Sequence, residues 1–477
     1  MKRLIPYRRI VVLIFLPALV LMTNAGCDPE RGASDQPNII YVLADDLGYG
    51  DLSCYGQKRF QTPHIDRLAS EGMRFTRHYS GSTVCAPSRC VLMTGMHTGH
   101  SEIRGNRGLE TEGQYPLSDS ALTVAALLQE QGYKTGAIGK WGLGGPGSTG
   151  DPLNQGFDYF FGYNCQREAH FYYPTHLWRN NEKYLIPENE NGNKEVYSQD
   201  LFIKEALQFI REHKDRPFFL YFPVTIPHAE LAIQEQDLEP FKGRYPETPY
   251  PGAHYGAQET PFAAFAAMVS RLDKDVGKIS ALLKELGIDK NTVVIFSSDN
   301  GPHTEGGHSP EFFNSNGSLR GVKRDLYEGG IRAPMIARWP GRIEAGTVSN
   351  HVSAFWDFLP TALEMAGGEL NYPTDGISFL PTLLGETQQE HEYLYWEFHE
   401  RGGKKALLKG DWKAVQLNIH SDPNGPLELY KLADDPGEDQ NLAEMHPDRV
   451  TEFRTLMEKA RTNSEIFKFT GQTYKGK

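Results

Sequence analysis

The sequence of 477 residues has few cysteines, no excess of positive charge and no internal repeat. Its five cysteines are an odd number spread along the chain, which excludes the dense disulfide framework of a small secreted scaffold. A formal net charge of -12 argues against nucleic acid or an anionic lipid surface as the main partner. With 39% hydrophobic and 23% charged residues, the chain has the composition of an ordinary globular protein.

The sequence also lacks an apolar run long enough to span a bilayer comfortably. The run from Ile10 to Met22 follows a cluster of Lys and Arg, which is typical of a targeting segment that is removed. Asn-Ala-Gly-Cys at 24–27 resembles a bacterial lipobox and predicts cleavage before Cys27 with a lipid anchor on its thiol. Asn24 departs from the usual Leu-like residue, so simple secretion stays the alternative. Either way we expect an exported protein of the periplasm or cell envelope.

Two predicted buried strands end in carboxylate or amide side chains. The apolar run 38–44 ends in Asp45 and Asp46, and the similar run 291–298 ends in Asp299 and Asn300. Open α/β sheets carry their sites at the carboxyl edge. Adjacent acids are costly to bury without a cation, and Ca²⁺ suits oxygen ligands without a Cys/His cluster. The alternatives are an exposed acidic turn and a plain Asp-Asn-Gly turn.

Cys85 stands just before a Pro-Ser step that can open a helix. Free backbone N–H groups and the positive end of the helix dipole favour an anion at this position. Arg89 falls on the same helix face one turn later, where its cation can pair with a nucleophile or a bound anion. This pattern favours Cys85 as a nucleophile. The alternative is a buried cysteine at a helix start with Arg89 in a surface ion pair.

Two longer strings carry a family resemblance. Residues 85–95 read C-x-P-S-R-x-x-L-x-T-G, which resembles the type I sulfatase signature at every fixed position. Residues 132–144 read G-Y-x-T-x-x-x-G-K-W-x-x-G, a second string of that family at the expected distance. The chain thus resembles the formylglycine-dependent, arylsulfatase-like enzymes of the alkaline phosphatase superfamily from about residue 37 to near the C-terminus.

The resemblance implies hydrolysis of sulfate esters, on sulfated carbohydrate or on aryl sulfates in assays. Cys85 would be oxidised to formylglycine by a maturation enzyme and would lie beside Ca²⁺. Lys140 and Lys323 resemble the two sulfate-binding lysines, and His228 resembles the acid that protonates the leaving alcohol. The expected catalytic residues are Cys85, Arg89, Lys140, His228 and Lys323, and the expected metal ligands are Asp45, Asp46, Cys85, Asp299 and Asn300.

One position departs from the family pattern. Many sulfatases carry a histidine after the Lys-Trp pair, whereas this chain has Gly142. In the family this histidine is a candidate base for the release of sulfate from the covalent intermediate. Either another histidine, such as His170 or His303, occupies its place near position 85, or sulfate release proceeds without it. We therefore take His170 and His303 as substrate-binding candidates. The irregular stretch 145–195 is rich in aromatic residues, which suggests a substrate wall for sugars or, equally, the packing of an irregular lobe.

We expect an α/β fold with a large mixed, mostly parallel sheet flanked by helices. The predicted segments are a signal peptide at 1–26, a polar tether at 27–36, a catalytic domain at 37–385 and a C-terminal antiparallel sheet with one helix at 386–477. Two other functions stay open: a phosphonate or phosphodiester hydrolase of the same superfamily, and a catalytically silent lipoprotein that binds sulfated glycan. The intact set of acids, lysines and His228 argues against the silent protein.

Overall fold

The computed structural model describes Met1 and residues 36–109 and 112–469. Cys27, with its predicted lipid anchor, lies outside the described residues, as do 2–26 of the predicted signal peptide and 27–35 of the tether. In the described part of the chain, no helix combines the length and apolar character needed to cross a membrane.

A ten-stranded mixed sheet organises the protein, in the order β13-β2-β12-β11-β1-β10-β6-β7-β8-β9. The strands are β1 Asn38–Ala44, β2 Met73–Phe75, β6 Lys134–Lys140, β7 Tyr159–Tyr163, β8 His176–Arg179, β9 Glu182–Leu185, β10 Phe218–Pro223, β11 Thr292–Ser298, β12 Met335–Arg338 and β13 Thr347–Ser349. The neighbours β11, β1, β10, β6 and β7 all run parallel, so their carboxyl ends share one edge. This arrangement confirms the predicted fold class.

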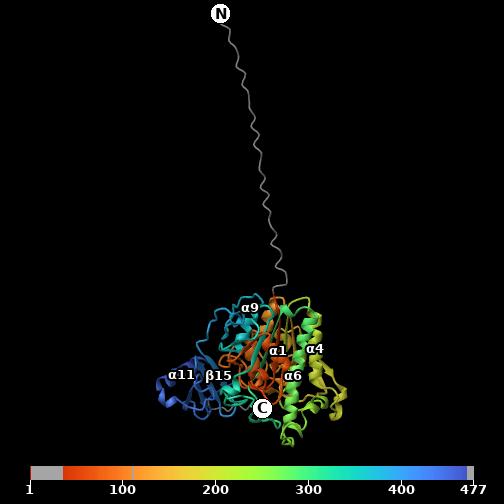
Figure 1. The fold of residues 1–477 in the computed structure, drawn as a ribbon. Coiled ribbons are helices and arrows are strands. Elements are labelled where there is room, and N and C mark those ends of the chain that lie inside the picture. Colours follow the sequence, from red (N-terminus) through yellow and green to blue (C-terminus); the bar gives the residue numbers. More distant parts are fainter. Residues whose placement is uncertain (2–35, 110–111, 470–477) are drawn as a thin grey trace. The chain divides into compact units, whose positions relative to one another are not determined.

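Helices cover both faces of this sheet. The helices of the described chain are α1 Pro63–Ser70, α2 Cys85–Thr94, α3 Val124–Glu130, α4 Ser198–His213, α5 Glu235–Leu238, α6 Pro261–Glu285, α7 Pro310–Phe313, α8 Glu328–Ile331, α9 Phe358–Met365, α10 Leu380–Leu384 and α11 Pro447–Lys459. Figure 1 shows α1, α4 and α6 side by side on one face.

The central strand β1 divides the core in two. Ile39, Tyr41 and Leu43 belong to the core that includes residues of α2, α3 and α9. Ile40 and Val42 belong to the core that includes residues of α1, α4 and α6. Successive side chains of a strand point to opposite faces, so an uninterrupted apolar run is what a strand covered on both faces requires.

Short strands and a C-terminal sheet complete the fold. The short pairs are β3 His78–Tyr79 with β14 Ser353–Ala354, and β4 Gly108–Leu109 with β5 Gly113–Gln114. The C-terminal antiparallel sheet is β15 Leu394–Phe398, β16 Lys404–Lys409, β17 Trp412–Leu417 and β18 Leu427–Lys431. Phe453 and Met457 of α11 pack with this sheet in a core of their own. Figure 1 labels α11 and β15 in this part of the molecule. The domain boundary after residue 385 stays a prediction.

A buried ion pair links this C-terminal sheet to the short helix α8. Glu328 opens α8 and accepts hydrogen bonds from Lys413 Nζ of β17 and from the Tyr79 hydroxyl, both at 2.9 Å. Burial alone would raise the pKa of Glu328, but the charges of Arg332 and Lys413 lower the pKa to about 2. The carboxylate therefore stabilises the folded protein fully above its ordinary pKa of 4.5, and this contribution is lost as the pH falls toward 2.

We expect Glu328→Gln to lower the free energy of unfolding at pH 7 by about 3 kcal/mol, because the stabilisation that belongs to the depressed pKa disappears. The variant should also show a weaker loss of stability between pH 4.5 and pH 2 than the natural protein. Urea unfolding at a series of pH values measures both effects. Glu344→Gln, at an exposed position, is the control. Equal pH dependence in Glu328→Gln and the natural protein would contradict the assignment.

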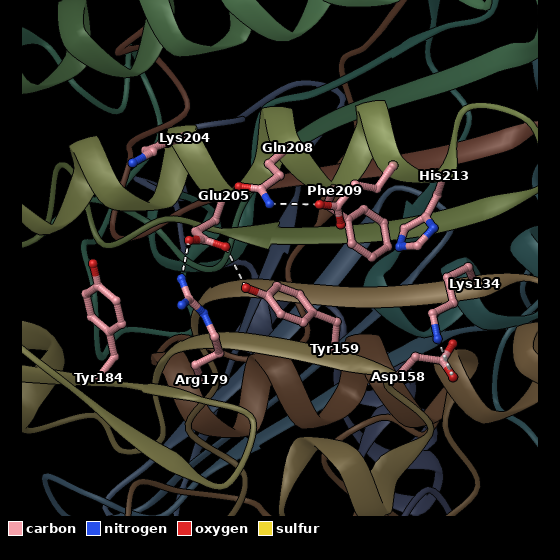
Figure 2. A pocket seen from close by; sticks show the side chains of 11 residues that line it. Lys134, Asp158, Tyr159, Arg179, Tyr184, Lys204, Glu205, Gln208, Phe209 and His213 are labelled. Atoms are coloured by element: carbon pink, nitrogen blue, oxygen red, sulfur yellow. Dashed lines mark hydrogen bonds and ion pairs between the residues drawn. The ribbon is translucent and has the colours of Figure 1, made fainter.

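A pocket of about 600 Å³ lies between α4 and the strands β7 and β8 (Figure 2). Arg179 and Tyr159 both point to the carboxylate of Glu205 there, and Lys134 pairs with Asp158 at 3.1 Å. Lys134 is the first residue of β6, so this pocket lies at the amino edge of the parallel strands. The predicted site residues lie at the other edge.

Candidate active site

Helix α2 begins at Cys85 and brings its sulfur to the carboxyl edge of the sheet. Val84 before it is extended, and Gly95 ends the helix in the left-handed conformation, with φ +69° and its N–H on the Val91 carbonyl. Cys85 is 2% exposed, and its Sγ lies 3.3 Å from Asp45 Oδ1. The predicted nucleophile position therefore faces the first predicted acid.

The ends of β1 and β11 are tied together by their polar side chains. The Asp46 N–H donates to Asp299 Oδ1 at 3.1 Å, and Asn300 Nδ2 donates to Asp46 Oδ1 at 2.7 Å. Asp46 has φ +63°, an uncommon conformation for a residue other than glycine, and it is fully buried. Asn300 Oδ1 is buried and has no hydrogen-bond partner among the described residues. The two strand ends therefore gather oxygen atoms around one point.

Three cations face these three carboxylates. Lys140 Nζ lies 2.6 Å from Asp45 Oδ2, and Lys323 Nζ lies 2.7 Å from Asp46 Oδ2. Arg89 donates from Nε and Nη2 to Asp299 Oδ2, at 3.1 and 2.7 Å. We call these six side chains the edge cluster. Its formal charges cancel, and buried charges need such pairing because each is expensive to remove from water alone.

Three predicted histidines lie together beside the edge cluster. His228 follows β10, and its Nε2 lies 2.9 Å from Lys323 Nζ and 3.3 Å from Asp46 Oδ2. Burial and the Lys323 charge hold the pKa of His228 well below its usual range, so the ring is neutral at pH 7. His170 stacks on it with ring centroids 4.4 Å apart, and the His303 centroid lies 5.8 Å away. The structure therefore brings all of the predicted site residues to one edge.

The structure places the side chain of Gln166 against Gly142, and which group takes the role of the family histidine stays a prediction. Gly142 has φ +80°, and a Cβ at this position would overlap the side-chain amide of Gln166. His303 contacts the Pro227 carbonyl at 3.2 Å. Gln166 follows β7 in an irregular segment, and nothing in its sequence neighbourhood marked it. The position of Gln166 beside Gly142 follows from the pairing of β6 with β7, which the sequence alone does not reveal.

A second group of polar side chains lies beyond the C-terminal end of α2. His100 Nδ1 lies 2.9 Å from Asp375 Oδ1, and His97 Nε2 lies 3.7 Å from the same oxygen. The Gly99 N–H donates to His97 Nδ1 at 3.1 Å, so the neutral ring carries its proton on Nε2. Without a lone pair on Nε2, His97 is a poor metal ligand. We interpret this group as structural support for the loop after α2.

The fold and the edge cluster together define a class: a hydrolase with the alkaline phosphatase-like architecture. Family comparison makes the assignment narrower. Residues 37–368 match the sulfatase family, and residues 322–463 match the C-terminal domain of N-sulphoglucosamine sulphohydrolase. The chain belongs to the sulfatase family and is a sulfuric ester hydrolase.

Individual relatives agree with this family. The N-acetylgalactosamine-6-O-sulfatase of Bacteroides thetaiotaomicron is 30% identical over 531 residues, covering 94% of this chain and 99% of that protein. Human arylsulfatase A is 34% identical, covering 89% of this chain and 86% of that protein. The solved structure of Ps i-CgsB in complex with k-i-k-neocarrahexaose has a TM-score of 0.75 and 29% identity, covering 89% of this chain and 92% of that chain.

Proposed function

We propose that this protein hydrolyses sulfate esters on sulfated carbohydrate, with formylglycine at position 85 and Ca²⁺ at the carboxyl edge of the sheet. The observation that carries the proposal is the position of Cys85 Sγ, 3.3 Å from Asp45 Oδ1 at the start of α2. Lys140, Lys323 and Arg89 surround the same point with fixed cations.

The environment of Cys85 favours conversion over direct use of the thiol. Burial and the nearby charge of Asp45 raise the pKa of Cys85 well above its usual value. The thiol is therefore protonated at neutral pH, and a protonated thiol is a poor nucleophile. A formylglycine supplies, once hydrated, a hydroxyl nucleophile that does not depend on a thiolate.

The residues at the strand ends fit Ca²⁺. Asp45, Asp46, Asp299 and Asn300 offer only oxygen atoms, the ligands that Ca²⁺ prefers. Asn300 Oδ1 is a buried acceptor without a donor, which a cation would satisfy. The formal charge supports a divalent cation as well. The three carboxylates and three cations of the edge cluster sum to zero, and Ca²⁺ would give the site a positive charge that attracts a monoanionic sulfate ester.

The proposed roles of the other side chains follow from their positions. Lys140 and Lys323 would bind the sulfate oxygens, and Arg89 would hold Asp299 and support position 85. His228 is neutral, so the proton that it would pass to the departing alcohol oxygen would come from the Lys323 ammonium beside its Nε2. Stabilisation of the charge on the transferring group by fixed cations is the expected main source of rate.

The substrate class comes from the relatives. Two of those named above are an N-acetylgalactosamine-6-O-sulfatase and a structure in complex with a neocarrahexaose. We extend this to a sulfated N-acetylhexosamine or galactose unit of a glycan. The chain also shares its fold with the phosphonate monoester hydrolase of Agrobacterium radiobacter, at a TM-score of 0.65 and 19% identity. A phosphonate or phosphodiester hydrolase of the same superfamily is the second candidate, and relative turnover of sulfate esters and phosphodiesters separates the two.

The mass of the tryptic peptide that contains Cys85 tests the proposal, in protein made with the maturation enzyme. We expect a loss of about 18 Da relative to cysteine, because the thiol becomes an aldehyde. The same preparation should release sulfate from an aryl sulfate faster than it cleaves a phosphodiester. An unmodified thiol in a protein that still turns over aryl sulfate would overturn the formylglycine proposal. An unmodified thiol without turnover would support the silent glycan-binding alternative.

A further inference from the structure

A cavity of about 280 Å³ lies against the segment 164–171, which leads from the end of β7 toward the active site. Its volume is near the lower end of the ~300–1,000 Å³ typical of small-molecule sites, so it suits one sugar unit. The lining side chains that matter here are Glu112, Asn164, Glu168, Phe171, His176 and Trp178.

The cavity lies at the carboxyl edge of the sheet, where the Asn164 carbonyl accepts from the Gly142 N–H at 3.1 Å. His170 stacks on His228, with ring centroids 4.4 Å apart. Phe171, the next residue, lines the cavity and is 49% exposed. Tyr163 and Asn164 of the lining lie beside Lys140 at the ends of β7 and β6, so an occupant of the cavity would lie at the same edge of the sheet as the edge cluster.

Asn164 gives this cavity an unsatisfied carboxamide. The residue is 3% exposed, and neither Nδ2 nor Oδ1 has a hydrogen-bond partner in the part of the chain that the structure describes. Buried amides are nearly always paired, and one that is not calls for a ligand or a water. A carboxamide both donates and accepts, which matches hydroxyl or acetamido groups. Trp178 and Phe171 add apolar faces against which a sugar ring can pack.

The charges around the cavity decide which sugar fits. Burial alone would raise the pKa of Glu112, but hydrogen bonds from Trp178 and His176 lower it, so its carboxylate is ionised. His176 Nε2 lies 2.9 Å from Glu112 Oε1, and Glu168 adds a second carboxylate to the lining. Lys183 Nζ lies 3.4 Å from Glu112 Oε1 and Arg167 Nε lies 3.3 Å from Glu168 Oε1, but neither cation lines the cavity. A uronate or a second sulfate here would therefore contact two carboxylates whose cationic partners lie outside the lining.

We infer that this cavity binds the uncharged sugar unit that adjoins the sulfated sugar, with Asn164 as its hydrogen-bonding anchor. The inference rests on the proposed function for the identity of the glycan. It assigns the chain a preference for glycans in which the sulfated unit has a neutral neighbour.

Calorimetric titration of the full chain tests this, in a Cys85→Ala background that prevents turnover. The probes are two disaccharides, a 6-O-sulfated N-acetylgalactosamine joined to galactose and the same sugar joined to glucuronate. We expect Asn164→Leu to weaken binding of the galactose probe roughly tenfold, because paired hydrogen bonds are lost. Glu112→Gln should improve binding of the glucuronate probe roughly fivefold by removing like charge. Asn424→Leu, at an exposed position between β17 and β18, is the matched control.

Equal affinity of Asn164→Leu and its control for the galactose probe would overturn the inference, provided that thermal unfolding shows both variants folded. An unchanged ratio between the two probes in Glu112→Gln would overturn the charge argument even if Asn164→Leu failed to fold. Turnover of an aryl sulfate by the Cys85 protein is measured separately. Its absence would count against the proposed function alone, because the binding measurements do not depend on turnover.

Discussion

Cys85→Ala is expected to reduce the turnover of an aryl sulfate by roughly 10⁴-fold or more, the scale of loss seen when an enzyme's nucleophile is removed. The reason is local: the side chain at the start of α2 lies 3.3 Å from Asp45 Oδ1, in the middle of the edge cluster, and no other described cysteine reaches this point. Initial rates of sulfate release by purified variants measure the effect.

Cys54→Ala is the control for this prediction. Cys54 is a free, half-buried cysteine in the 3₁₀ turn Ser53–Tyr55 after β1, and its substitution also removes a thiol. It should leave the rate of sulfate release within about twofold, since surface and loop changes away from special features have small effects. Retention of more than about one hundredth of the natural rate in Cys85→Ala would exclude position 85 as the nucleophile.

The strand ends and the helix of the site could be predicted from the sequence because each has a local signal. The apolar run of β1 stops at Asp45, the run of β11 stops at Asp299, and Cys85 precedes a Pro-Ser step. Parallel strands then place these ends on one edge, whatever lies between them. Only the tertiary structure shows which charges pair with each other: Arg89 forms an ion pair with Asp299, and Lys140 forms one with Asp45.

The remainder of the site had no such local signal. Asn164 and Gln166 lie in an irregular segment, where neither the helical nor the strand period applies. Their burial depends on the pairing of β6 with β7 and on the glycine at 142, which leaves room for the Gln166 amide. Lys413 is a further case: a lysine in a strand ordinarily faces water, and only the approach of Glu328 and Glu438 makes it a buried ion pair.

Asp46→Asn is expected to abolish the stabilisation of the protein by Ca²⁺ and to lower aryl sulfate turnover by roughly 10³-fold. Asp46 is fully buried and contacts Lys323 at 2.7 Å, Asn300 at 2.7 Å and His228 at 3.3 Å. Its substitution therefore removes a proposed metal ligand. It also removes the negative charge that pairs with Lys323, a proposed sulfate-binding lysine. Loss of one preorganised electrostatic partner alone costs about 10²–10³ in rate.

Thermal unfolding with and without added Ca²⁺ separates these two effects. A ligand that binds only the folded state raises the unfolding temperature, so the natural protein should show an upward shift and Asp46→Asn should not. Asp273→Asn is the matched control, because Asp273 is a buried carboxylate that accepts from the His64 and Ile65 N–H groups, away from the edge cluster. It should keep the full shift. If Ca²⁺ raised the unfolding temperature of Asp46→Asn as much as that of the natural protein, the metal site would not be at the strand ends. Loss of this increase with unchanged turnover would show that the reaction does not need the ion.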